Sequence, residues 1–187
     1  MMIKTFPKLS VDNFELRLLQ KTEAGLVLNF NKKNEEHLKR WDPPKPEGFD
    51  TKHYWEEKAL LWRKEFLEDQ SCRLIIFKED SMVGSINFTN FERGPFQNAR
   101  LGYKICSSLE GQGVMSACLR TALDYVFKDL SLHRVEANCI PHNHRSRALL
   151  KRLGFVEHGI AKDYLMIDGR WQDHVLTSLV TPFKAKK

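Results

Sequence analysis

Residues 101–115 read LGYKICSSLEGQGVM and place an alternating, strand-like run directly before two glycines. The alternation predicts a strand over residues 98–106. After Gly111 and Gly113, apolar residues recur at helical spacing and predict a helix over residues 114–130. The segment is therefore expected to form a strand, a tight turn and the start of a helix.

The Gly-x-Gly turn is a candidate anion site. Glycines let backbone N–H groups approach a ligand closely, and a helix N-terminus adds unpaired donors and partial positive charge. Together these features predict a pyrophosphate site. The alternative is an ordinary turn between a strand and a helix. The dinucleotide pattern GxGxxG is absent because residue 116 is Ser, and no Gly-Lys-Ser/Thr of a P-loop follows.

A second informative stretch covers residues 141–155, PHNHRSRALLKRLGF. Asn143 is a suitable N-cap for a helix over residues 143–153, and Gly154 is the expected left-handed terminator. Phe155 would then pack back on Leu150. A capped amphipathic helix accounts for the whole pattern without any ligand.

The rest of the chain alternates helical and strand-like patterns. We expect a strand over 16–20, a helix from Thr22 through 34, and a helix over 51–67 capped by Asp50. Further strands are expected over residues 72–78, 82–90, 133–139, 164–167 and 171–180. Tight hairpins imply antiparallel pairs, and the strand–helix–strand run over 98–139 implies one parallel pair. The expected fold class is a mixed α/β domain rather than a doubly wound parallel sheet.

Length and composition restrict the function classes. The 187 residues fit one domain, residues 1–187, with 42% hydrophobic content. No run is long enough for a membrane helix, and the start, MMIKTFP, has no secretory h-region. The four cysteines are expected to be free thiols in a reducing cytoplasm, and no metal-ligand spacing occurs. The net charge of +6, part of it in the tail at residues 184–187, favours polyanionic partners.

Together, the Gly-x-Gly turn and the later Asn-x-x-Ser-x-x-Leu-Leu-x-x-Leu-Gly-Phe stretch resemble the GCN5-related N-acetyltransferase superfamily. That family's loop reads Gln/Arg-x-x-Gly-x-Gly/Ala, so Glu110 and Met115 depart from it while the central Gly-x-Gly remains. Residues 141–155, with 161–177 after them, are similar to the ribosomal-protein-alanine N-acetyltransferases of this superfamily.

The resemblance implies a mostly antiparallel sheet split in a V, flanked by helices, with acetyl-CoA in the split. Asn143 would reach the pantetheine amide. The other cofactor-binding positions would be Ile105, Cys106, Ser107, Gly111, Gln112, Gly113, Val114, Met115 and Ser116. The acceptor would be the N-terminal alanine of a small-subunit ribosomal protein, which implies a cytoplasmic enzyme that can contact the ribosome or ribosomal RNA.

The resemblance also implies direct acetyl transfer to the amine, for which the leaving thiolate needs a proton donor. Many relatives place a tyrosine seven residues after the cap asparagine, but Leu150 stands there. Ser146 is the expected substitute, its alternative role being reinforcement of the helix cap. Asp173 and His174 are the nearest candidates for a general base, which stays unassigned.

On the acceptor side, Trp41 and Trp171 are expected to wall the cleft, although buried tryptophans more often belong to a core. The polar face formed by Ser85, Asn87 and Thr89 is expected to meet an incoming peptide. Two other readings stay open. One is a different acceptor on the same fold: a lysine, a polyamine or an antibiotic amine. The other is a ribosome- or RNA-binding module without activity, although no basic run interleaved with aromatics supports it.

Overall fold

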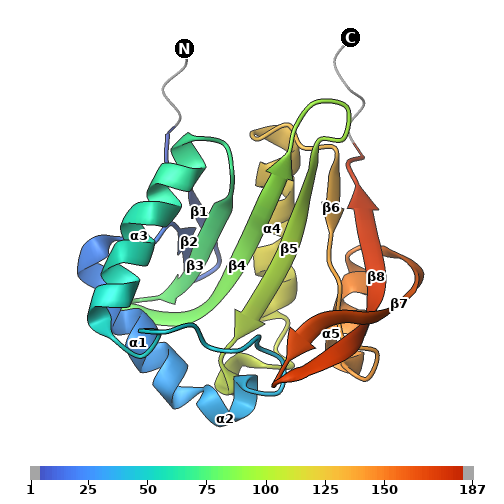
Figure 1. Ribbon diagram of the computed structural model, residues 1–187. Coiled ribbons are helices and arrows are strands. Elements are labelled where there is room, and N and C mark those ends of the chain that lie inside the picture. Colours follow the sequence, from blue (N-terminus) through green and yellow to red (C-terminus); the bar gives the residue numbers. More distant parts are fainter. Residues whose placement is uncertain (1–4, 183–187) are drawn as a thin grey trace.

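The computed structural model describes residues 5–182. Within them, eight strands form one sheet in the order β1-β2-β3-β4-β5-β6-β8-β7 (Figure 1). The strands are β1 Lys8–Val11, β2 Phe14–Arg17, β3 Cys72–Lys78, β4 Ser81–Glu92, β5 Asn98–Ile105, β6 Arg134–Glu136, β7 Val156–Ile167 and β8 Arg170–Val180. Only β5 and β6 run parallel in this part of the chain, which confirms the mixed, mostly antiparallel sheet.

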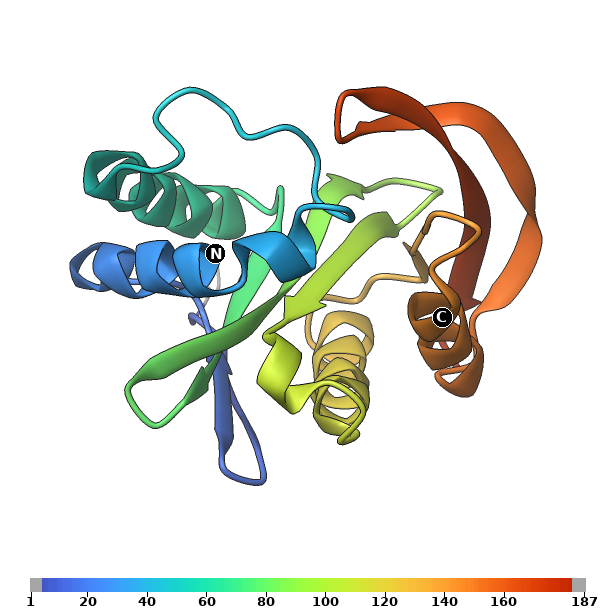
Figure 2. The same ribbon diagram turned by 90° about the horizontal axis from the view of Figure 1, so that it is seen from below.

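Helices cover both faces of the sheet. The α-helices are α1 Ala24–Lys33, α2 Glu35–Leu38, α3 Lys52–Leu67, α4 Val114–Lys128 and α5 His144–Arg152, and two 3₁₀ turns are η1 Lys21–Glu23 and η2 Ser107–Leu109. Figure 2 shows α1 and α3 on one side of the sheet and α4 and α5 on the other.

Each pair of helices closes its own apolar core. The larger core lies under α4 and α5, where Leu119 and Leu150 are at most 1% exposed. The smaller core lies under α1 and α3 and includes Trp55, Ala59 and Ile75. Burying a side chain of leucine size contributes roughly 1.5–3 kcal/mol, so the two cores hold the helices firmly against the sheet.

The sheet is split between β5 and β6. These strands pair only over Asn98–Arg100 and Arg134–Glu136. Beyond that point β5 stays paired with β4, while the chain after Glu136 follows β8 through a bridge between Cys139 and Val175. The V-shaped split expected from the family resemblance is therefore present (Figure 1).

The N-terminal region differs from the sequence predictions. The strand predicted over 16–20 is β2, Phe14–Arg17, and it forms a hairpin with β1, which the sequence did not reveal. β1 is a short edge strand with little burial and so shows no clear alternation. The predicted helix from Thr22 starts as a 3₁₀ turn, where the Glu23 carboxylate accepts a hydrogen bond from the Gln20 N–H at 2.8 Å.

Three other boundaries also shift. Thr51, not Asp50, caps α3, because its Oγ1 accepts a hydrogen bond from the Tyr54 N–H at 3.2 Å. β6 is shorter than the predicted 133–139, since the chain turns away from β5 to form the split. β7 begins at Val156 rather than residue 164, and its early residues are mostly exposed, which removes the alternation that a prediction needs.

Candidate active site

The turn after β5 presents a row of free backbone donors at the start of α4. Gly113 is the N-cap residue, and the N–H of Ala117 donates to the Gly113 carbonyl at 3.1 Å. The N–H groups of Gly113, Val114, Met115 and Ser116 therefore precede the first helical hydrogen bond. No side chain of the described residues caps this helix start. The arrangement can bind an anion such as a pyrophosphate.

Both glycines of the turn have a conformational reason to be glycine. Gly111 has φ of +73° and Gly113 has φ of +80°, a region that L side chains rarely adopt. A Cβ at either position would meet no atom within 4 Å, so the space outside the turn is open to a ligand. Gln112 braces the turn, since its Nε2 donates to the Ser108 carbonyl at 2.6 Å. The Met115 side chain is buried in the core, so this residue can offer a ligand only its backbone.

The end of β5 is anchored by α1, a link the sequence analysis missed. Ile105 is buried, and the next N–H, that of Cys106, donates to the Val83 carbonyl at 2.8 Å. The N–H of Ser107 donates to Oδ1 of Asn34 at 3.3 Å across 73 positions of sequence. Asn34 is itself buried at the end of α1. This contact fixes where the Gly-x-Gly turn begins.

Glu110 stands where the resembling family has Gln or Arg, and it draws two basic side chains to the turn. His37 of α2 places Nε2 3.2 Å from its Oε1. Arg145, near the start of α5, forms an ion pair with its Oε2. The carboxylate thus links α2, the turn and α5 around the lower end of the split.

The two residues predicted on α5 adjoin the split, and one of them has an unforeseen partner. Asn143 is the N-cap, as predicted, and its Oδ1 accepts a hydrogen bond from the Ser146 N–H at 3.1 Å. The Ser146 hydroxyl lies 2.8 Å from the Tyr103 hydroxyl of β5. Burial raises the pKa of Tyr103 to about 12, so its phenol stays protonated at neutral pH. Burial also raises the pKa of the nearby Cys139 thiol, against a hydrogen bond with Ser146.

Leu150, which stands where many relatives are expected to have a tyrosine, is part of the core. Leu150 is 1% exposed, whereas Tyr103 brings a phenol to Ser146 from the neighbouring strand. The sequence pattern put Tyr103 on an apolar strand face, and nothing in that pattern showed that its hydroxyl meets α5. Only the tertiary structure, which brings Ser146 of α5 to Tyr103 of β5, reveals the pair.

The two candidate bases are engaged elsewhere on the β7–β8 hairpin. The Asp173 carboxylate lies 2.6 Å from Lys162 Nζ and accepts the Asp163 N–H at 3.1 Å. These hydrogen bonds lower the pKa of Asp173. His174 is buried, its ring contacts Tyr164, and Nδ1 lies 3.0 Å from the Gln172 carbonyl oxygen. Neither arrangement identifies a general base.

The residues predicted on the acceptor side are separated in the structure. Trp41 contacts the His142 ring at 5.7 Å between centroids, whereas Trp171 lies on the hairpin and is 59% exposed. On β4, Ser85 is buried, while Asn87 and Thr89 are partly exposed. Of the predicted polar face, Asn87 and Thr89 therefore remain candidates for contact with a peptide.

Two features are absent from residues 5–182, a metal-binding cluster and a membrane-spanning helix. No group of three or more His, Cys, Asp or Glu side chains could hold a metal ion there. In the same residues, no helix is long and apolar enough to cross a membrane. The basic tail at residues 184–187 lies outside the described part of the chain.

Comparisons with known proteins agree with this geometry. Residues 13–156 match the acetyltransferase (GNAT) domain family. The chain is 36% identical over 177 residues to the ribosomal protein uS5-alanine N-acetyltransferase of Escherichia coli K12, covering 94% of this chain and 91% of that protein. The crystal structure of a ribosomal-protein-S5-alanine acetyltransferase from Vibrio fischeri superposes with a TM-score of 0.90 at 30% identity, covering 94% and 97% of the two chains.

A further solved structure, RimJ of Mycobacterium smegmatis in complex with CoA-disulfide, superposes with a TM-score of 0.85 at 29% identity, covering 96% of this chain and 88% of that one. The split sheet, the uncapped helix after the Gly-x-Gly turn and these matches lead to one conclusion. The chain belongs to the GNAT family of acetyltransferases.

Proposed function

We propose that the protein transfers an acetyl group from acetyl-CoA to the N-terminal alanine α-amine of a small-subunit ribosomal protein. The observation that supports the cofactor is the uncapped start of α4 beside the split in the sheet. The uS5-alanine specificity named for the Escherichia coli and Vibrio fischeri relatives supports the acceptor. This activity would place the protein in the cytoplasm, and its +6 charge suits contact with ribosomal RNA.

The chain offers acetyl-CoA two kinds of contact. The N–H groups of residues 113–116, together with the left-handed turn at Gly111, would hold the pyrophosphate. The edge of β5 that faces the split, ending at Ile105, Cys106 and Ser107, would pair with the pantetheine arm as an added strand would. The side-chain Oδ1 of Asn143 is used in capping α5, which leaves its amide N–H₂ for the arm. Acetyl-CoA itself supplies the acetyl thioester.

Ser146 is the proposed proton donor to the leaving thiolate. Its hydroxyl is held by Tyr103, whose phenol remains protonated because burial raises its pKa to about 12. Tyr103 can therefore donate to Ser146 when Ser146 gives up its proton. Tyr103 is a positioning residue in this scheme, since it acts through Ser146.

An N-terminal α-amine suits a site without an assigned base. Its free pKa is roughly 7.7–8.0, so about a tenth is already neutral at pH 7, whereas a lysine side chain at about 10.4 is almost wholly charged. Asp173 is held by hydrogen bonds and the His174 ring is buried, and neither is assigned as a general base here. The amine that needs the least help in losing a proton is therefore the favoured acceptor.

A pair of peptides tests the acceptor. One has a free N-terminal alanine and an internal lysine, and the other has the same sequence with a blocked N-terminus. Product mass and fragmentation locate the acetyl group. We expect modification of the first peptide at its α-amine; equal or faster modification of the blocked peptide would make lysine the acceptor. Incubation with purified ribosomal proteins then identifies the acceptor protein.

A further inference from the structure

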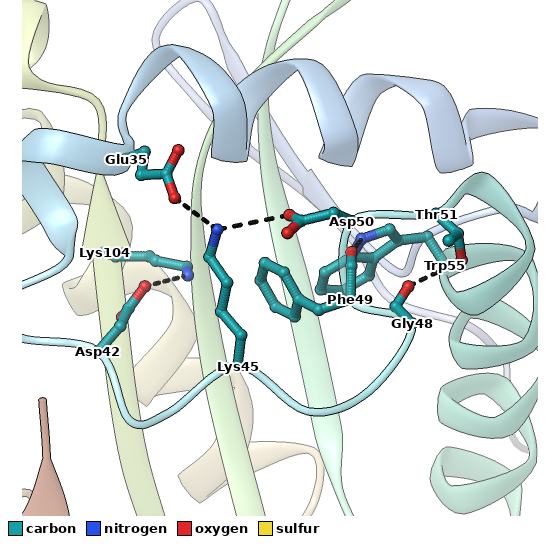
Figure 3. Close-up of polar contacts among 9 residues, drawn as sticks. All are labelled: Glu35, Asp42, Lys45, Gly48, Phe49, Asp50, Thr51, Trp55 and Lys104. Carbon is teal, nitrogen blue, oxygen red and sulfur yellow. Dashed lines mark hydrogen bonds and ion pairs between the residues drawn. The ribbon is translucent and has the colours of Figure 1, made fainter. Parts of the chain in front are cut away.

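Residues 39–51, which we call the strap, join α2 to α3 and connect both arms of the split sheet. The Trp41 ring contacts His142, which lies between β6 and α5. The next residue, Asp42, accepts a hydrogen bond from Lys104 Nζ of β5 at 2.9 Å (Figure 3). Two consecutive strap residues thus reach the two sides of the split.

The sheet face beside this ion pair has an open position. Lys104 is opposite Ser85, and Gly102 is opposite Asn87, and residues opposite one another in an antiparallel pair share a face. A Cβ on Gly102 would meet no atom within 4 Å, and its φ lies outside the left-handed region. Neither crowding nor backbone conformation therefore requires glycine there, and its effect is to leave space.

An unsatisfied polar atom faces the same part of the sheet. Oδ1 of Asn87 is buried and has no hydrogen-bond partner among the described residues. An unpaired buried acceptor is destabilising. A donor supplied by a ligand would remove that destabilisation, and the empty position at Gly102 lies directly across from Asn87.

Successive side chains on β5 divide the site into two halves. Because strand side chains alternate between faces, Tyr103 and Lys104 point to opposite sides of the sheet. Tyr103 meets Ser146 on the α5 side, and Lys104 meets Asp42 on the strap side. The proposed proton donor for the thiolate and the Asp42–Lys104 pair therefore flank the same end of β5 from opposite faces.

We propose that Asp42 receives the acceptor's amine, with Lys104 balancing its charge, and that the space at Gly102 takes the acceptor's first residue. Oδ1 of Asn87 accepts a further N–H of the acceptor backbone. This inference rests on the proposed function and names the acceptor subsite of the same reaction.

The pairing of Asp42 with Lys104 matters for the pKa of the acceptor's amine. A carboxylate alone would stabilise the ammonium form of the acceptor and raise its pKa, so the amine would be a poorer nucleophile at neutral pH. A lysine ammonium beside the carboxylate cancels that effect, and the amine keeps a pKa close to its free value of about 7.7–8.0. Acetyl transfer then needs no strong base.

The other charged groups near this face are largely paired with one another. Lys45 lies 2.6 Å from Glu35 and 3.4 Å from Asp50 in the strap region (Figure 3), and Arg73 lies 3.4 Å from Glu65. Arg100 shares the face of β5 with Lys104, and His142 lies beside Trp41. On the hairpin, Lys162 and Asp173 form an ion pair with each other. The Asp42–Lys104 ion pair is therefore the one that joins β5 to the strap.

Three variants test the pair on the peptide with a free N-terminal alanine. Asp42→Asn should raise the acceptor KM by about tenfold, the size of one lost charged hydrogen bond, and shift the pH profile of kcat, which reports the bound amine, downward. Lys104→Met should shift the profile upward by about half to one unit, because the unbalanced carboxylate holds the ammonium form. Lys45→Met breaks the other strap ion pairs and should change neither quantity by more than about twofold.

Opposite pH shifts from the two variants would not arise from a merely structural ion pair. Equal effects of Lys45→Met and Asp42→Asn would mean that the strap only needs to be held in place, which overturns the inference. Unshifted pH profiles in both Asp42→Asn and Lys104→Met would overturn it as well. The KM for acetyl-CoA, measured in the same assays, should stay within about twofold in all three variants.

Gly102 gives a separate test of the space. Gly102→Val should raise the acceptor KM by at least about tenfold and leave CoA affinity unchanged, with Gly102→Ala in between. Normal acceptor kinetics in both variants, with normal melting, would overturn the subsite. If the wild-type enzyme instead prefers the lysine of the blocked peptide, the proposed function fails. The acceptor KM of the same Gly102 variants, measured with the blocked peptide, then tests the subsite separately. No activity on either peptide would overturn both.

Discussion

The two sides of the split are built in different ways. The proposed cofactor side consists of residues 105–116, which are contiguous, and it offers a ligand mainly backbone N–H groups. The proposed acceptor side joins side chains from the strap, β4 and β5, and its central contact, Asp42 to Lys104, spans 62 positions. A site made of local backbone can be predicted from a short pattern, whereas one made of distant side chains depends on how the whole chain folds.

The difference has a chemical reason. A pyrophosphate is recognised by donors that every residue carries, so the turn needs only glycines and a helix start. An acceptor amine needs a charged or polar side chain of the right kind, placed at one point. Substitutions in the strap and on the strand face would therefore alter the preference for an acceptor and leave the proposed cofactor side unchanged.

The largest expected effect concerns Ser146, which lies where the two sides meet. Ser146→Ala should lower kcat by about 10²–10⁴-fold and leave acetyl-CoA affinity unchanged, since a general acid acts as the thiolate forms. Steady-state kinetics with a CoA titration by calorimetry measure both quantities. A loss below about threefold would make Ser146 only a structural neighbour of the cap.

A second variant, Tyr103→Phe, tests whether Ser146 depends on its hydrogen-bond partner. Tyr103→Phe should lower kcat less, by about tenfold, because Ser146 keeps its hydroxyl but loses its partner. Because burial raises the pKa of Tyr103 to about 12, no step in kcat from this group is expected between about pH 6 and 10. A kinetic step in that range in the wild type, absent from Tyr103→Phe, would show that the phenol ionises during turnover.

The next effect tests the cofactor side alone. Gly111→Asp or Gly113→Asp should weaken CoA binding by about 100-fold, because each puts a carboxylate beside the pyrophosphate at a positive φ. Gly94→Asp is the matched control. Gly94 also has a positive φ, +69°, with no atom within 4 Å of its would-be Cβ, but it lies in the turn before β5 at the opposite end of that strand. Equal CoA affinity in all three variants would remove the turn from the site.

A smaller effect separates the two roles of Asn143. Asn143→Asp keeps a good helix cap, so the melting temperature should stay near that of the wild type. The variant loses the amide donor, and we expect the KM for acetyl-CoA to rise by about tenfold. Unchanged kinetics with unchanged melting would leave Asn143 as a cap for the Ser146 N–H and nothing more.

The smallest effect contrasts a structural ion pair with the Asp42–Lys104 pair. Burial favours the neutral form of Glu23, but its hydrogen bonds to Arg17 and the Gln20 N–H prevail and lower its pKa. A lowered pKa contributes stability above the unfolded value and loses it as pH falls through the folded value. Glu23→Gln should therefore destabilise the fold by about 1–2 kcal/mol at pH 7 and by less at about pH 3.

Thermal melts at the two pH values measure this effect. Glu23 lies far from β5 in sequence and belongs to η1, so both KM values should be those of the wild type. A changed acceptor KM in Glu23→Gln would erase the contrast between a pair that holds the fold and a pair that receives a substrate.

The family resemblance and the strand–turn–helix pattern were enough to predict the split sheet, the Gly-x-Gly turn before α4 and the capped helix α5. They were not enough for β1 and the first half of β7, whose exposed side chains show no periodic burial. The cap of α3 is Thr51 rather than the predicted Asp50. Both residue types are good N-caps, so the sequence pattern fits either one, and the backbone geometry determines which of them caps the helix.

The sequence by itself determined the parts of this protein that depend on residues close along the chain: the Gly-x-Gly turn, the helix start that follows it, and the Asn143 cap. Backbone conformation and hydrogen bonding within a few residues decide such features. Only the tertiary structure decided the pairs Tyr103–Ser146, Ser107–Asn34 and Asp42–Lys104. Each joins elements whose distance in space is set by two packed cores and by the divergence of β5 from β6, and no local pattern carries that information.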